Sequence, residues 1–240
     1  MPLKQYLYHG QASGVDANIT EPGPYKLDGH GKCGVSNGQP GQHAGQHTGF
    51  TMTGGLSHGP CVTSVNAMPE DKDGFFRTEI RATVDNLRVD GKSVLSVDRI
   101  SLGLVCVYSR HWFDRPGHHS RRTRVLPMDC SFQNLTLNGA PLDAKLPAPF
   151  HYSVDRRESY LKADEPDPTI LTEVREAILS SPSRVIFVPN FGRIFFGEWT
   201  LIPGVNLHSV HQISMLRMAF SSPPSGDGTG GNGQGGGTGG

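Results

Sequence analysis

The chain has 240 residues, and its 22 Lys and Arg residues balance 22 Asp and Glu residues, so its formal charge at neutral pH is zero. This balance excludes a global electrostatic attraction to nucleic acids or anionic membranes, and any charged partner would have to bind locally. Hydrophobic residues make up 35% of the sequence, and 31 glycines account for much of the deficit, which still allows one core. No apolar run approaches the roughly 18 residues of a membrane-spanning helix.

The first quarter of the chain favours short strands joined by long loops. Short apolar stretches between residues 10 and 60 are separated by turn residues such as Asn37-Gly38. The segment from Met1 to His9 lacks the apolar centre of a signal peptide, so either export is absent or a signal was replaced by this start. We therefore predict a loop-rich N-terminal part over residues 1–76.

The middle of the chain predicts two hairpins. From residue 78 apolar and polar residues alternate, and the apolar phase changes around Asp85-Asn86, which indicates a bulge. Asp90-Gly91 then separates two alternating runs, and Asn138-Gly139 does the same further on. Both dipeptides are typical of a type I′ turn, because its two central residues need positive φ angles.

The last third of the chain predicts one helix followed by a β-meander. Asp167 is placed as N-cap and Pro168 as the first helical residue, before an apolar stripe that we expect to dock on a sheet. Residues 184–188, 192–202 and 205–220 then read as three successive strands separated by turns. The stripe consists of Ile170, Leu171, Val174, Ala177 and Ile178.

These elements predict an all-β fold, mainly an antiparallel β-sandwich or barrel-like, with one short helix near residues 168–180. We expect one β-rich domain over residues 1–222. Residues 223–240 are expected to form a disordered Gly-rich tail, because ten of the sixteen residues from Ser225 to Gly240 are glycine and none is apolar. The expected core consists of Ile80, Val84, Leu102, Leu104, Phe195, Trp199, Leu201 and Ile213.

Four cysteines, Cys33, Cys61, Cys106 and Cys130, contain no C-x-x-C pair. This excludes zinc ribbons and thioredoxin-like motifs, and leaves two disulfides in one of three pairings or four reduced thiols. Two glycosylation sequons, at Asn18 and Asn134, favour an extracellular protein.

Eleven histidines raise the question of a metal site. His43 and His47 lie in a glycine-rich stretch, where only a loop would let them chelate together. His208 and His211 are expected on opposite faces of a strand, and His118-His119 are adjacent. Because no carboxylate or cysteine stands at ligand spacing, we predict no metal site and no cofactor.

An arginine-rich segment from Arg110 to Arg124 is the candidate ligand-binding site. Arginine forks bind phosphate or sulfate, and a neighbouring aromatic ring can stack on a base or sugar. The alternative is a charged surface loop, and nucleic acid is not expected. No catalytic motif is present, so no catalytic residue is predicted. The candidate binding residues are Arg110, Trp112, Arg115, Arg121, Arg122 and Arg124.

Several stretches together resemble the choice-of-anchor P family of bacterial surface proteins. They are the hairpin block ATVDNLRVDGKSVLSV, the strand ISLGLVCVYS, the pattern F-x-N-L-T-x-x-G-x-P-L, the segment G-x-I-x-x-x-E-W and the run N-L-H-x-V, all within residues 78–220. The resemblance implies a secreted β module followed by a variable C-terminal anchor. It implies no catalytic residues.

The sequence thus leads us to expect a non-enzymatic extracellular or surface module with a structural or adhesive role. Self-association through exposed β edges, or binding to a cell-surface polymer, would suit such a module. One alternative is binding of a polymer that bears phosphate or sulfate groups, through the loop from Arg110 to Arg124. The second alternative is an enzyme whose site is assembled from distant histidines and carboxylates.

Overall fold

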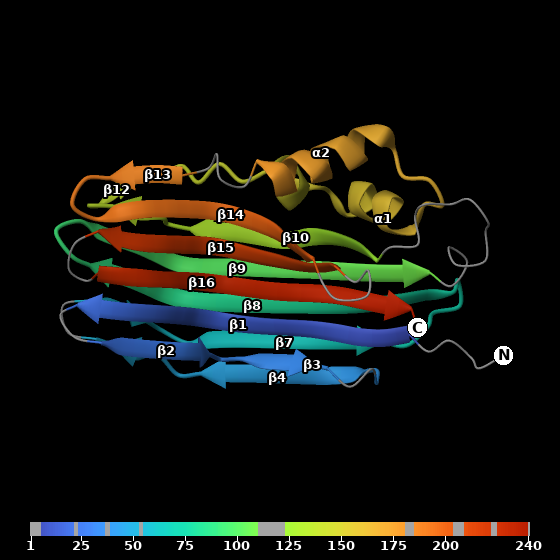
Figure 1. The fold of residues 1–240 in the computed structure, drawn as a ribbon, viewed down its shortest axis with the longest axis horizontal. Helices are drawn as coiled ribbons and strands as arrows, with labels where there is room; N and C mark the ends of the chain where they lie inside the picture. Colours follow the sequence, from blue (N-terminus) through green and yellow to red (C-terminus); the bar gives the residue numbers. More distant parts are fainter. Residues whose placement is uncertain are drawn as a thin grey trace.

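The computed structural model describes residues 6–21, 24–36, 39–52, 55–109, 123–180, 185–203, 209–221 and 225–239. Two antiparallel β-sheets lie face to face, and short helices cover one end of the sandwich (Figure 1). The buried apolar side chains of both sheets form one hydrophobic cluster. The predicted all-β class is therefore confirmed.

The first sheet has the strand order β13-β14-β15-β16-β1-β2, and β3 pairs with β1 beside β2. All of its neighbouring strands run antiparallel. Its strands are β1 (Tyr6–Glu21), β2 (Tyr25–His30), β3 (Cys33–Val35), β13 (Val185–Val188), β14 (Gly192–Pro203), β15 (Ser209–Ser221) and β16 (Ser225–Gly239).

The second sheet is built around the long hairpin of β8 and β9, with β10 and β11 pairing to β9, and β6 and β7 pairing to β8. β4 pairs with β7, β5 with β6, and β12 with β11. Its strands are β4 (Gly41–His47), β5 (Phe50–Thr51), β6 (Leu56–His58), β7 (Cys61–Met68), β8 (Phe75–Asp90), β9 (Val94–Ser109), β10 (Arg124–Gln133), β11 (Thr136–Leu137) and β12 (Ala140–Pro141).

The helical layer consists of η2 (Ala148–His151), α1 (Val154–Lys162) and α2 (Pro168–Leu179). The predicted start of α2 is confirmed, because the Asp167 side chain accepts a hydrogen bond from Thr169 N at 2.7 Å. α1, whose N-cap is Ser153, was not predicted from the sequence. Few of its residues are apolar, so it lacks the stripe that marks α2.

The predicted hairpins are confirmed, with one change of loop. Asn138 and Gly139 have φ angles of 53° and 78°, as a type I′ turn requires. Asp90 instead pairs with Val94, so the β8–β9 loop has three residues and not two. The change of apolar phase is also confirmed, because the buried positions pass from Val84 to Leu87. The predicted bulge is wrong: the pairing of β8 with β9 keeps one register across this point, and the phase changes at Asn86, which has φ 49°. The β13-β14-β15 meander is confirmed as well.

The predicted core residues are all buried except Leu201, which is 37% exposed. Leu201 has the same parity as Trp199 but lies nearer the end of β14, which is Pro203. The largest buried side chain, Trp199, donates from Nε1 to His211 Nδ1 at 3.0 Å. His211 is therefore a neutral hydrogen-bond acceptor inside the sandwich, and burial lowers its pKa to about 4.

The prediction of a loop-rich N-terminal part is wrong. β1 is a continuous strand of 16 residues, and residues up to 68 contain six further strands. Small inward residues such as Gly10 and Ala12 gave β1 a weak apolar alternation. The strand forms because its backbone pairs with β16 on one edge and with β2 and β3 on the other, a partnership that no local pattern reveals.

The prediction of a disordered tail is also wrong over residues 225–239. This segment forms β16, which lies between β1 and β15 (Figure 1). Glycine lets the facing sheet press against its backbone: a Cβ on Gly231 would lie 2.9 Å from Ile100 Cγ2. From its composition alone, this segment was not expected to offset the entropy cost of ordering. The backbone hydrogen bonds on both of its edges and the contact with Ile100 offset that cost.

We predict that Gly231→Ala destabilises the protein by about 2–4 kcal/mol. About 1 kcal/mol comes from placing a side chain at φ 65°, and about 1–3 kcal/mol from overpacking against Ile100. Gly139→Ala is the matched control, because Gly139 has φ 78° but a Cβ added there would meet no atom within 4 Å. Chemical denaturation should show a loss of only about 1 kcal/mol for the control. Equal losses would contradict the packing of β16 on the second sheet.

A second prediction concerns acid stability. The pKa of His211 in the folded state, about 4, lies below its ordinary value of 6.5, so the unfolded chain binds the proton first and stability falls as the pH drops below 6.5. We expect a loss of about 2 kcal/mol from this residue between pH 7 and pH 5. His211→Asn keeps an acceptor for Trp199 and cannot titrate. Denaturation at the two pH values should show a correspondingly smaller loss for the variant, and an unchanged pH dependence would contradict the prediction.

Candidate metal centre

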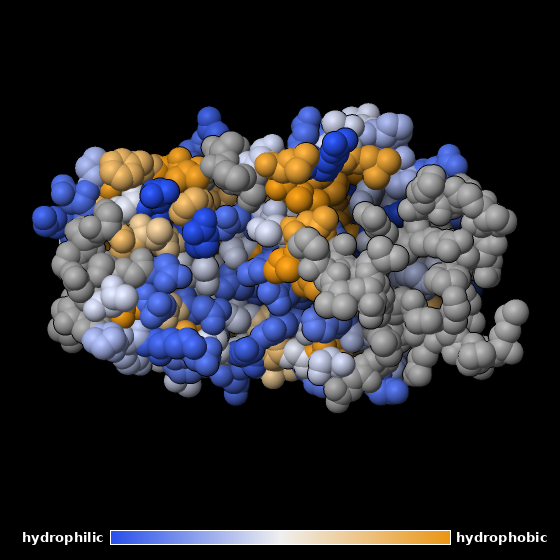
Figure 2. All heavy atoms as spheres, in the orientation of Figure 1, coloured by the Kyte–Doolittle hydropathy of each residue, from blue (hydrophilic) through white to orange (hydrophobic). Residues whose placement is uncertain are grey.

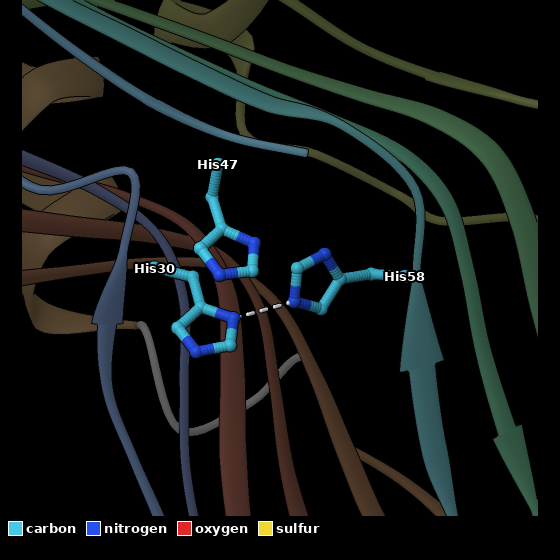
Figure 3. A group of neighbouring side chains, drawn as sticks. All are labelled: His30, His47 and His58. Carbon is cyan, nitrogen blue, oxygen red and sulfur yellow. Dashed lines mark hydrogen bonds between the residues drawn. The ribbon is translucent and has the colours of Figure 1, made fainter. Parts of the chain in front are cut away.

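Three histidines from different strands meet at one edge of the sandwich. His30 is the last residue of β2, His47 of β4 and His58 of β6. One ring nitrogen from each lies within 4.8 Å of the other two, and the rings turn toward one another (Figure 3). β2 belongs to the first sheet, whereas β4 and β6 belong to the second. The cluster therefore bridges the two sheets.

Glycines allow the backbones to approach closely enough to form this cluster. A Cβ on Gly14 of β1 would lie 2.6 Å from Cys61 Cβ, and a Cβ on Gly45 of β4 would lie 2.6 Å from the Gly31 carbonyl oxygen. The buried Thr63 hydroxyl donates to the same carbonyl oxygen. The turn that follows His30 is thus fixed against the second sheet.

Hydrogen bonds fix the tautomer of His58, which is 4% exposed. Its Nδ1 lies 2.7 Å from the Gly59 carbonyl oxygen, which can only accept, so Nδ1 carries the proton. Its Nε2 therefore presents a lone pair, which accepts from His30 Nδ1 at 2.9 Å (Figure 3). A histidine whose Nδ1–H is bound to a carbonyl is oriented as metal-ligating histidines usually are.

His47 needs a ring rotation before it can share an ion with His30. Their rings are stacked with centroids 3.8 Å apart and planes 11° apart. Imidazole lone pairs lie in the ring plane, so two parallel rings cannot direct them at one point. Gly49 N also donates to His47 Nδ1 at 3.2 Å, which places the His47 proton on Nε2. Metal binding would replace the stack and shift this proton.

The environment favours the neutral forms of His30 and His58. Burial lowers the pKa of His30, and the nearby His47 and His58 lower it further, while Asp16 opposes them. Burial also lowers the pKa of His58, with the Gly59 carbonyl opposing and His47 adding to the effect. Neutral imidazole is the form that binds metals, so little proton competition is expected at neutral pH.

An aromatic wall borders the cluster on one side. Phe50 lies 5.5 Å from His30 and 6.1 Å from His58, measured between ring centroids. Tyr25, which is 41% exposed, stacks on the outer side of Phe50 at 5.3 Å. The two rings are apolar neighbours, so the imidazoles supply the polar groups on this side of the site.

The four cysteines are free thiols in the structure, which is the second of the two alternatives left by the sequence, and no disulfide joins them. Their surroundings differ: Cys61 Sγ lies 3.3 Å from His58 Nδ1, and Cys33 Sγ lies 3.2 Å from the Thr63 hydroxyl. Burial raises the pKa of Cys61 to about 12. This thiol therefore stays protonated, on the side of His58 that faces away from Nε2, and is not a ligand.

The arginine-rich segment is described only at its end. Arg124 is buried, and its guanidinium donates to the carbonyl oxygens of Tyr160, Ala163 and Asp164. The prediction that Arg124 binds a ligand is wrong, because these donors bind the C-terminal end of α1 and the following residues. The other candidates, Arg110, Trp112, Arg115, Arg121 and Arg122, lie outside the described residues.

The sequence predicted no metal site, whereas the structure brings three possible ligands together. One of them, His47, was among the histidines that we considered from the sequence. His43 and His47 cannot chelate together as a loop would, because β4 is a strand and places them about 13 Å apart. His211 binds Trp199, and His118, His119 and His208 lie outside the described residues. The available signal was weak: each of His30, His47 and His58 stands within two residues of a glycine.

Comparisons with known proteins give the family and no further relative. No curated protein and no solved structure matches the chain. A family model described as "Domain of unknown function (DUF8256)" matches residues 6–168, which contain all three histidines of the cluster. The description does not mention choice-of-anchor P proteins, so that resemblance stays a prediction. Because the match spans more than half of the sequence, the chain belongs to the DUF8256 family.

Proposed function

We propose that the protein is a β module that binds one transition-metal ion through His30, His47 and His58. The observation that carries this proposal is the convergence of three ring nitrogens within 4.8 Å at the junction of the two sheets. A tetrahedral zinc ion with Zn–N bonds of about 2.0 Å needs its ligands about 3.3 Å apart. We expect rotation of the imidazole rings to supply the difference, with loss of the His30–His58 hydrogen bond and the His30–His47 stack.

The ligand type selects the class of metal. Three neutral imidazoles suit Zn²⁺, Cu²⁺ or Ni²⁺, whereas Mg²⁺ and Ca²⁺ prefer carboxylate and carbonyl oxygens. No carboxylate belongs to the ligand group among the residues that the structure describes. We choose Zn²⁺ as the test ion because it imposes little geometric preference and tolerates three protein ligands with water in the fourth position.

The position of the site supports a stabilising role. An ion held by β2 of the first sheet and by β4 and β6 of the second would cross-link the sheets at their shared edge. Such an ion binds the folded chain only, because the unfolded chain does not hold the three strands together. Binding energy therefore adds to folding stability.

An extracellular or surface module with a structural role remains our proposal for the wider setting. The exposure of both sequon asparagines, Asn18 and Asn134, supports it. Among the described residues, no helix is long and apolar enough to cross a membrane. Polyanion binding is the weaker alternative, because Arg124 is engaged with α1.

A metal-dependent enzyme is the second candidate. Three protein ligands leave a fourth position for water, which is the arrangement of catalytic zinc sites. Asp16 acts electrostatically on His30, and this carboxylate accepts hydrogen bonds from Ser13 and Asn232. These contacts orient it as a supporting group and not as a free base, so we favour the binding role.

We predict that the protein binds one Zn²⁺ per chain and that a hundredfold excess over Kd raises Tm by about 5–10 °C. His47→Ala is expected to weaken binding at least about a hundredfold, because loss of a metal ligand should reduce affinity at least as much as loss of a residue that supports a ligand. Isothermal titration calorimetry and thermal unfolding of the apo protein check both values. Binding should weaken as the pH falls below 6.5, the ordinary pKa from which those of His30 and His58 are lowered, because protons then compete for the imidazoles.

His43→Ala is the matched control. His43 lies on the same strand, four residues from His47, but is exposed and outside the cluster. Its replacement should leave Zn²⁺ affinity and the shift in Tm unchanged. Wild-type affinity in His47→Ala, or a loss of affinity in His43→Ala, would place the metal elsewhere and reject the proposed centre.

A further inference from the structure

β16 lies between β1 and β15 in the first sheet, and we call the space that it occupies the slot. The side chains of β16 contribute little to its binding there. It pairs with β1 from Gly239 opposite Tyr6 to Ser225 opposite Glu21, and with β15 from Gly235 opposite His211. Nine of its fifteen residues are glycine and none is apolar. The backbone ladders on its two edges therefore provide most of the binding of this strand.

The slot requires glycine at its centre. A Cβ on Gly230 would lie 3.3 Å from Ile100 Cδ1, and a Cβ on Gly231 would lie 2.9 Å from Ile100 Cγ2. The next residue, Asn232, donates to Asp16 Oδ2 at 3.2 Å. Gly-Gly-Asn occurs once in the sequence, at residues 230–232. The occupant that the slot selects is therefore β16, from the same molecule or from another copy.

The connection between β15 and β16 has three residues, two of which are proline. β15 ends at Ser221 and β16 begins at Ser225, and these two residues pair. Only Ser222, Pro223 and Pro224 join them along the chain. Proline fixes φ, and short constrained hinges favour exchange of the element that they connect, because the exchanged form extends the hinge.

We propose that β16 is exchanged between copies, so that Ser225–Gly239 of one molecule lies between β1 and β15 of another. The closed and exchanged forms contain the same ladders and the same contact with Ile100. Hinge conformation and protein concentration therefore set the equilibrium between them. A departing β16 uncovers the edges of β1 and β15, and strand addition by a second copy covers them again.

The outer face of the first sheet suits such an assembly. Over β1 and β16 it is mainly hydrophilic, whereas apolar side chains gather beside α2 and β14 (Figure 2). The exposed apolar residues of α2 and β14 include Leu171, Leu201 and Ile202. Exchange of β16 needs no apolar contact surface, because the strand finds the same partners, β1 and β15, in the second copy.

The first test deletes residues 222–224 from the full chain. A direct bond between Ser221 and Ser225 prevents the closed hairpin in its present register, so the proposal predicts folded dimers or larger species in sedimentation. The matched control lengthens the hinge with six Gly and Ser residues and should be monomeric. A folded monomer from the deletion variant would overturn the proposal.

The second test supplies β16 as a peptide of residues 225–239 to the full chain carrying Gly231→Val, which weakens its own strand. The wild-type peptide should raise the Tm of this chain and be retained at least about tenfold more than a peptide carrying Gly231→Val, given the overpacking at Ile100. Equal retention, or no retention, rejects exchange. This result decides the question if the deletion variant does not fold.

Both tests are carried out in a metal chelator. Their outcomes therefore do not depend on the three-histidine centre, and failure of either proposal leaves the other standing. Size measurements over a range of wild-type concentrations complete the series. The exchanged fraction should rise with concentration and, once formed, fall slowly on dilution, because both ladders of β16 must open before the strand can return.

Discussion

The close approach of the two sheets at glycine positions is the constraint on which the rest of the structure depends. Packed sheets ordinarily stand about 10 Å apart, a spacing set by side chains from both inner faces. Gly14 lets β1 approach Cys61, and Gly231 lets β16 approach Ile100. The first contact brings the edge of one sheet to the edge of the other, where His30, at the end of β2, can reach the two histidines of the second sheet.

Local signals in the sequence predicted the parts of the fold that depend on local geometry. Asn138-Gly139 forms the expected turn, because positive φ angles at both residues are a property of the dipeptide. Asp167 caps α2 because its carboxylate reaches an amide two residues away. Leu201 shows the limit of this reasoning: parity assigned it to the buried face, but it is exposed near the end of β14, and the alternation does not encode where burial ends along a strand.

The parts that could not be predicted depend on contacts between distant segments. β16 has no apolar side chain, so hydrophobic periodicity gave no sign of a strand that is stabilised by the edges of β1 and β15. The metal centre was missed for a related reason. Spacing along the chain identifies ligands on one element, whereas His30, His47 and His58 come from three strands in two sheets, brought together by the close approach at the glycines.

Asp16 on β1 interacts both with β16 and with a histidine of the proposed metal centre. Its carboxylate accepts a hydrogen bond from Asn232 of β16 and acts electrostatically on His30 of β2. Departure of β16 would remove the Asn232 donor and leave Ser13 as a partner of this carboxylate. Val15, next to Asp16, pairs with Gly230 of β16 on one edge and with His30 on the other. If β16 leaves and this part of β1 shifts, His30 shifts with it. Strand occupancy and metal binding would then favour each other, and by thermodynamic linkage a bound metal would hold β16 more tightly in its slot.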